Sequence, residues 1–172
     1  MEKLPKTMKA LVSYGAGDYR LETNVPVPEA GIGEIIIKIE ACGICAGDVK
    51  AEHGAAMFWG DNGQNSWVKP PFIPGHEFVG KIVQMGTDVK GDFKVGDRVV
   101  ADQIVPCWEC RFCKTGKYWM CQKHDIFGFQ SNVNGGMAEY MRLPKEALVY
   151  KLPKDMPIEK AALVEPYACA KH

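Results

Sequence analysis

Residues 107–121 read Cys-Trp-Glu-Cys-Arg-Phe-Cys-Lys-Thr-Gly-Lys-Tyr-Trp-Met-Cys, with two, two and seven residues between successive cysteines. Two residues between thiolates let backbone turns direct both sulfur atoms to one ion, and four thiolates complete a tetrahedral zinc shell without an open position. An iron–sulfur cluster and four unrelated buried cysteines are the alternatives, and this spacing favours neither. We therefore expect a structural zinc site in a lobe spanning residues 106–122, with the ligands Cys107, Cys110, Cys113 and Cys121.

Outside this stretch, short segments of alternating apolar and polar residues are separated by turns rich in glycine and proline. Alternation over four to eight residues is typical of half-buried strands, so the pattern predicts a mainly β fold, a partly open barrel with short helices. Helices are expected at 45–52 and within 157–172, and a long surface loop at 54–74. The expected strands are 9–14, 19–25, 34–42, 78–85, 98–104, 138–143 and 147–151.

The overall composition narrows the function classes. The 172 residues contain 21 Lys and Arg against 21 Asp and Glu, and this balance argues against nucleic acid or an anionic membrane as the main partner. No apolar run approaches the roughly 20 residues that span a bilayer, and the N-terminus lacks the apolar core of a signal peptide. We expect a cytoplasmic protein whose seven cysteines are reduced, so that clustered cysteines bind metal rather than form disulfides.

A second set of potential metal ligands is dispersed along the chain. Cys45 begins a predicted helix, His76 and Glu77 precede a predicted strand, and Glu165 lies near the C-terminal helix. A thiolate, an imidazole and a carboxylate from distant segments form the mixed shell of a catalytic zinc site. Each residue alone is more often structural, and the spacing leaves both interpretations open.

Several motifs resemble one family. Residues 75–80 read Gly-His-Glu-Phe-Val-Gly and are followed by Gly86 and Val89, which matches the zinc-containing alcohol dehydrogenase signature G-H-E-x2-G-x5-G-x2-V at every fixed position. Gly43-Ile44-Cys45-x-x-Asp48 resembles the catalytic-cysteine motif of that family, and the cysteines of 107–121 resemble its structural-zinc lobe. The chain is identified as a member of the medium-chain dehydrogenases/reductases. The resemblance implies a GroES-like catalytic domain at residues 1–156 and, at 157–172, the start of a helical connection to a Rossmann domain outside this chain.

The resemblance also implies roles for individual residues. Cys45 and His76 would bind the catalytic zinc, Glu77 and Glu165 would share the remaining position, and Asp48 would accept the N–H of His76. NAD(H) or NADP(H) would bind the Rossmann domain, since no cofactor-binding residue is recognised here. Relatives of this kind suggest a homodimer or homotetramer.

The pair Glu165-Pro166 is similar to the sorbitol and threonine dehydrogenase branch, so the expected activity is oxidation of a polyol of sorbitol or tetritol type to a ketose. This chain alone is not expected to catalyse the reaction. One alternative is a threonine or secondary-alcohol dehydrogenase. The other, in a different class, is a binding or scaffold module that zinc stabilises and that has no catalytic activity.

Two features depart from the family pattern. Gly47 stands where a Ser or Thr usually relays the substrate proton, which leaves water, Glu77 or Glu165, or a substrate hydroxyl as the route. Thirty residues separate Cys45 from His76, and this insertion carries aromatic and amide side chains. Phe58 and Trp59 are the predicted substrate contacts, with the amides of Asn62, Gln64 and Asn65 beside them. The alternative is a loop packed by its own aromatics.

Overall fold

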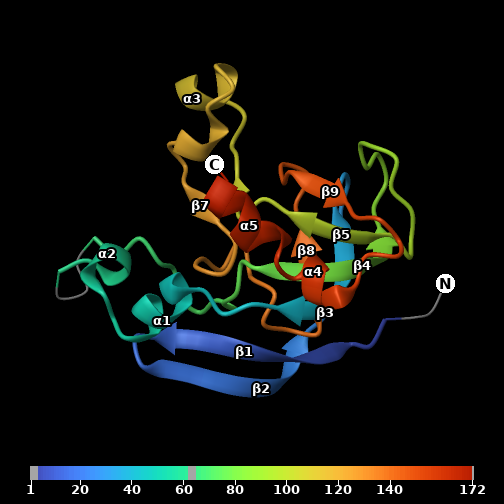
Figure 1. The fold of residues 1–172 in the computed structure, drawn as a ribbon. Helices are drawn as coiled ribbons and strands as arrows, with labels where there is room; N and C mark the ends of the chain where they lie inside the picture. The colour runs from blue at the N-terminus through green and yellow to red at the C-terminus, as the bar shows by residue number, and fades with distance from the viewer. Residues whose placement is uncertain (1–3, 62–64, 172) are drawn as a thin grey trace.

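The computed structural model describes residues 4–61 and 65–171. Its largest sheet is antiparallel, with the strand order β8-β3-β4-β5-β9. These strands are β3 (Ile35–Cys42), β4 (Phe78–Met85), β5 (Arg98–Ala101), β8 (Tyr140–Leu143) and β9 (Val149–Lys151). None of the helices in the described ranges combines the length and the apolar character that a membrane crossing requires. Figure 1 shows this sheet as the body of the domain.

The core lies between the curved strands of this sheet. Ile35 and Ile37 of β3 point into one apolar cluster with Phe78 and Ile82 of β4, and Lys38 is exposed. The register pairs Ile37 with Ile82, so alternate residues of neighbouring strands meet on the same face. Burial of β-branched side chains on a pleated surface explains why these segments form strands.

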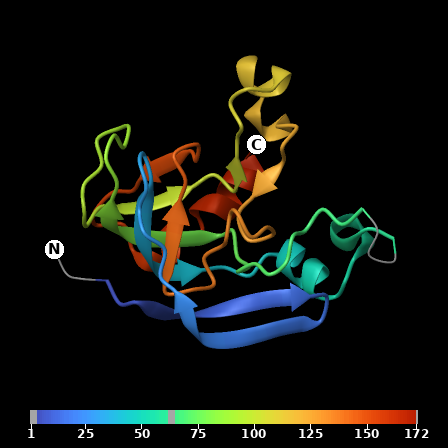
Figure 2. The same cartoon turned by 180° about the vertical axis from the view of Figure 1, so that it is seen from behind.

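A long hairpin lies along one side of the sheet. It consists of β1 (Thr7–Gly15) and β2 (Asp18–Pro26). Isolated bridges join Ala10 to Ala138 and Ser13 to Phe72, which attaches the hairpin to the body at two points. Figure 2 shows the hairpin from behind, running beneath the sheet and the helical segment that follows β3.

Two excursions leave the body on different sides (Figures 1 and 2). One contains α1 (Ala46–Glu52) and α2 (Ala56–Trp59). The other projects from the paired strands β6 (Ile104–Val105) and β7 (Asp125–Ile126), and it contains α3 (Arg111–Lys114) and the 3-10 helix η1 (Tyr118–Met120). After β9 the chain continues through α4 (Ile158–Ala161) and α5 (Val164–Lys171).

The predicted mainly β architecture is confirmed, and 78–85 matches β4 at both ends. The predicted strands 138–143 and 147–151 begin two residues later, as β8 and β9. Three other predicted segments differ in their organisation. The segment 98–104 is two strands, because the Asp102 carboxylate accepts the N–H of Ile104 at 3.0 Å and turns the chain between them. The loop 54–74 contains α2, whose four residues are too few to show a period. The C-terminal helix is broken before α5, since Pro166 has no N–H to donate to Ala162.

Candidate metal centres

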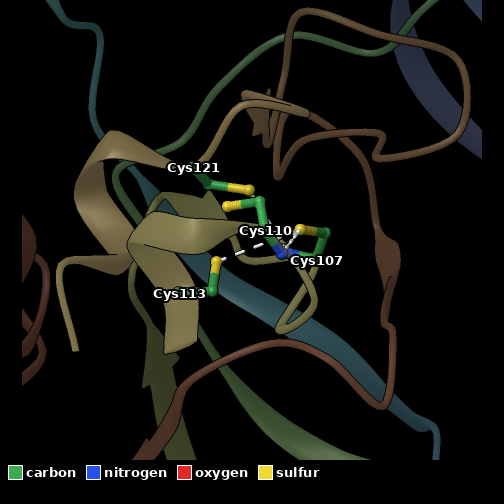
Figure 3. A group of neighbouring side chains, drawn as sticks. All are labelled: Cys107, Cys110, Cys113 and Cys121. Carbon is green, nitrogen blue, oxygen red and sulfur yellow. Dashed lines mark hydrogen bonds between the residues drawn. The ribbon is translucent and has the colours of Figure 1, made fainter. Parts of the chain in front are cut away.

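The four predicted structural-zinc ligands converge. One ligand atom from each of Cys107, Cys110, Cys113 and Cys121 lies within 4.8 Å of the others. Figure 3 shows the four side chains pointing toward one another, Cys113 from α3 and the others from the chain on either side of it. Backbone N–H groups also point at the sulfurs: those of Cys110 and Cys107 donate to Cys107 Sγ and Cys121 Sγ, both at 3.3 Å. Such donors favour thiolates, so this lobe holds a four-cysteine site suited to zinc.

A second group of ligand atoms meets where β3 ends and β4 begins. Cys45 directly precedes α1, and His76 and Glu77 directly precede β4. The antiparallel register pairs Cys42 with Phe78, so the segments just beyond this pair must lie side by side. One ligand atom each of Cys45, His76 and Glu77 lies within 4.8 Å of the others. The sheet therefore brings together three side chains that are far apart in sequence.

Asp48 lies next to this group, in the first turn of α1. Its Oδ2 accepts the N–H of Cys45 at 2.9 Å, which holds the ligand loop against the helix. Its Oδ1 is 3.6 Å from His76 Nδ1, beyond ordinary hydrogen-bond distance, and neither atom has another partner among the described residues. Burial lowers the pKa of His76, but the carboxylate of Asp48, together with the charges of Glu165 and Glu77, outweighs burial, and the pKa is raised. The predicted hydrogen bond thus stays a prediction, supported by the approach of two buried polar atoms.

Glu165 is placed differently from the other predicted ligands. It lies in the first turn of α5, is 7% exposed, and does not belong to the group within 4.8 Å. Its Oε1 accepts the thiol of Cys169 at 3.2 Å. Burial raises the pKa of Glu165, whereas Cys169 and the charge of His76 oppose that rise. The structure therefore places Glu165 within electrostatic reach of His76 but outside the converging group.

The predicted substrate contacts lie in packed surroundings. Phe58 is 7% exposed and stacks on Phe129 with 5.2 Å between ring centroids. The indole N–H of Trp59 donates to the carbonyl of Ala51 at 2.6 Å. Both side chains thus anchor the insertion, and their contact with substrate stays a prediction. The predicted amides Asn62 and Gln64 lie outside the described residues.

Sequence reasoning missed Phe129. Its ring lies 5.4 Å from the ring of His76, between centroids, and is 4% exposed. The residue follows β7 and returns from the cysteine lobe, far along the chain from His76. Nothing in its local sequence distinguishes it from an ordinary core phenylalanine.

Comparison with known proteins places these sites in a family. Residues 31–154 match the family model of the alcohol dehydrogenase GroES-like domain. The chain belongs to this family. The similar proteins are zinc-containing medium-chain dehydrogenases. The similarity covers nearly the whole length of this chain.

Relatives of this GroES-like domain are longer proteins. The erythritol/L-threitol dehydrogenase of Mycolicibacterium smegmatis is 51% identical over 172 residues, a match that covers 99% of this chain and 47% of the relative. The sorbitol dehydrogenase of Bacillus subtilis is 34% identical, covering 98% and 45%. A crystal structure of a putative zinc-binding dehydrogenase from Sinorhizobium meliloti, bound to NADP, superposes with a TM-score of 0.83 at 31% identity, covering 98% and 45%. The chain thus spans about half the length of the relatives it matches.

Proposed function

We propose that this domain is the catalytic half of a zinc-dependent polyol dehydrogenase, which oxidises a sugar alcohol to a ketose with NAD or NADP. The observation that carries the proposal is the convergence of Cys45, His76 and Glu77 within 4.8 Å. The 51% identity to an erythritol/L-threitol dehydrogenase supports a short sugar alcohol as substrate. The four-cysteine site is assigned to zinc that stabilises the lobe.

The chemistry of the converging residues fits a zinc ion. Zinc takes sulfur, nitrogen and oxygen ligands at about 2.0–2.3 Å, so two ligand atoms on one ion lie about 4.6 Å apart or less. Ligand atoms within 4.8 Å of one another therefore need only a small side-chain movement to share an ion. Burial raises the pKa of the Cys45 thiol, and the nearby carboxylates of Glu77 and Asp48 raise it further. A cation among these residues would reverse that effect and hold the thiolate. Cys45, His76 and Glu77 would therefore hold the ion.

When bound, zinc would lower the pKa of an alcohol hydroxyl as a Lewis acid, and the nicotinamide would accept the hydride from the carbinol carbon. The residues of this chain would bind the zinc ion and hold its ligands in position. Asp48 holds the Cys45 loop through its Oδ2 and faces His76 with its Oδ1 at 3.6 Å, and a hydrogen bond formed across this gap would fix the orientation of the ring. Glu165, whose pKa is raised by burial, is a proton acceptor at the edge of the site. We assign it the second carboxylate role, exchanging with Glu77.

The side chains of this site limit the routes by which the alcohol proton can leave. Gly47 offers no hydroxyl, so the alcohol proton leaves through the Glu77 or Glu165 carboxylate, through water or through a neighbouring hydroxyl of the polyol. Each of these routes is compatible with a substrate that carries several hydroxyl groups.

The test uses the complete protein that contains this domain, loaded with zinc. Erythritol, threitol and five- and six-carbon polyols are supplied with NAD or NADP, and cofactor reduction is followed by absorbance. We expect at least one polyol to be oxidised and Cys45→Ser to lose activity by about a thousandfold or more. The matched control is Cys42→Ser, because Cys42 is half-buried, lies three residues away and is not in the converging group. No polyol oxidation by the wild type, or full activity of Cys45→Ser, would refute the proposal.

A further inference from the structure

The half-buried side chain of Trp67 contacts residues beside both candidate metal centres. It belongs to the insertion that precedes His76, and its ring lies 5.3 Å from the ring of Phe129 and 5.3 Å from the ring of His124, between centroids. Phe129 in turn lies 5.4 Å from the ring of His76. His124 follows Cys121, a ligand of the four-cysteine site, by three residues. One indole therefore contacts the neighbour of a catalytic ligand and the chain that leaves the cysteine lobe.

On the side of the lobe, Trp67 binds a constrained residue. Its indole N–H donates to the carbonyl of His124 at 3.2 Å. His124 has a φ of 54°, an uncommon conformation for a residue with a side chain, which persists where the surrounding contacts hold it. Burial raises the pKa of the Cys121 thiol, but backbone N–H groups, that of His124 included, favour the thiolate, and the pKa is lowered. The backbone of His124 thus faces the cysteine cluster with its N–H and Trp67 with its carbonyl.

On the side of the Cys45 group, the segment after Trp67 is joined to Phe129 through the backbone. The N–H of Lys69 donates to the carbonyl of Phe129 at 3.1 Å, and the N–H of Ser131 donates to the carbonyl of Lys69 at 3.1 Å. These bonds hold the two segments side by side. A shift of Trp67 therefore acts on Phe129 through the ring contact and through the chain.

A buried polar cluster holds the same indole. Gln130 and Asp125 are each 5% exposed. With its amide oxygen toward Trp67, Gln130 accepts the indole N–H at 3.1 Å and donates to Asp125 Oδ1 at 3.0 Å. The other carboxylate oxygen of Asp125 accepts the amide of Asn132 at 3.0 Å and lies 2.7 Å from Lys123 Nζ. A buried polar network whose members are all paired is rigid, so it favours one position of the Trp67 ring.

We propose that Trp67 is a positioning residue that couples the two metal centres. With the four cysteines on one ion, the chain that leaves the lobe is fixed, and His124 holds the indole of Trp67. The ring of Trp67 then supports Phe129 against His76. When the lobe loses its ion, this support loosens, so the Cys45 group binds its own ion less tightly. The inference rests on the proposed function, which assigns an ion to the Cys45 group.

The test measures zinc affinity in the complete enzyme rather than turnover. Competition with a chelator gives a Kd for each of the two sites, and the site that is lost in Cys45→Ser identifies the Cys45 group. Because energetic coupling through a chain of contacts is shown only by perturbing both ends, the lobe is emptied by Cys113→Ser in the wild type and in a Trp67 variant.

The variant that cuts the link is Trp67→Phe. It keeps an aromatic ring against Phe129 and removes the indole N–H. The matched control is Trp108→Phe, because the indole N–H of Trp108 also donates to a backbone carbonyl, that of Glu146 at 2.9 Å, whereas its ring packs on Tyr118. Both substitutions thus remove one indole hydrogen bond, and only the first removes it from the path to Phe129.

We expect Trp67→Phe to weaken zinc binding at the Cys45 group about tenfold, the lower end of what supporting residues contribute, and Trp108→Phe to leave it unchanged. Cys113→Ser should weaken the same site about tenfold in the wild type. In the Trp67→Phe background it should weaken the site by less than about twofold, because the link is already cut.

A lower melting temperature in Trp67→Phe with unchanged zinc affinity would show a merely structural role and overturn the inference. Independent, additive effects of Cys113→Ser and Trp67→Phe would overturn it as well. If Cys113→Ser does not fold, the comparison of Trp67→Phe with Trp108→Phe decides. A wild type that binds zinc only at the four cysteines refutes the proposed function and this inference together, whereas two bound ions with equal affinities in all variants refute this inference alone.

Discussion

Replacing Phe129 with alanine should destabilise the domain and, separately, weaken zinc binding at the Cys45 group. The ring is 4% exposed and lies in a cluster with Phe58, Phe72 and Trp67. A buried phenylalanine cut to alanine costs about 3–5 kcal/mol, and the high burial here places the expected loss near 4 kcal/mol. The missing ring also removes the surface that supports His76 at 5.4 Å. Loss of such support around a ligand lowers metal affinity by about 10–100-fold.

The control for this prediction is Phe127→Ala. Phe127 is fully buried in the sheet core and makes an edge contact with Phe78, but it belongs to a different cluster from the rings beside His76. Both variants should therefore lose similar free energies of unfolding in urea titrations. Only Phe129→Ala should release one zinc ion faster to a competing chelator, whereas the four-cysteine zinc is retained by both.

The corresponding leucine variants serve if the alanine variants do not fold, because they keep most of the volume and cost less. Equal zinc release from the Phe129 and Phe127 variants would refute the reasoning, since it would show that His76 does not depend on this ring. A loss below about 1 kcal/mol in Phe129→Ala would contradict the packing argument itself.

Two further predictions concern stability. Cys113→Ser should remove the structural zinc and unfold residues 106–122, seen as a lower melting temperature, whereas Cys45→Ser should leave the melting temperature nearly unchanged; equal losses would contradict this division. Hydrogen bonds from Arg98, and then Lys81, lower the pKa of Glu40 despite partial burial. Its stabilisation is therefore present above the unfolded-state pKa and lost as pH falls through the folded-state value. Glu40→Gln should lower the free energy of unfolding by about 1 kcal/mol at neutral pH. The urea midpoint of this variant should also fall less than that of the wild type as the pH is lowered from about 7 to about 3. A steeper fall of the urea midpoint in Glu40→Gln than in the wild type would contradict the predicted direction of this pH dependence.

The sequence predicted those features that depend on local spacing. The four cysteines follow one another closely enough that turns alone direct them inward, and β4 shows its alternation without interruption. The meeting of Cys45 with His76 was predicted from the resemblance, and the register of β3 on β4 gives its physical reason. These results need only the local chain and one pair of neighbouring strands.

Other features depend on contacts between distant segments, which spacing does not encode. Phe129 reaches His76 because the chain returns from the cysteine lobe across the insertion, and α2 forms because Phe58 finds that ring to pack against. The position of Glu165 depends on the helix break between α4 and α5, just before Val164, and on how α5 then packs. The gap of 3.6 Å between Asp48 and His76 is likewise set by packing, which a motif does not reveal.

The central claim is that Cys45, His76 and Glu77 hold an ion on which alcohol oxidation depends. The most direct test measures zinc content and turnover of the complete enzyme during stepwise chelation, with Cys45→Ser in parallel. The account predicts two zinc ions per chain in the wild type and one in the variant, with turnover falling as the more labile ion leaves and returning when zinc is restored. A single ion in both proteins, bound at the four cysteines, with turnover unaffected by chelation, would contradict it.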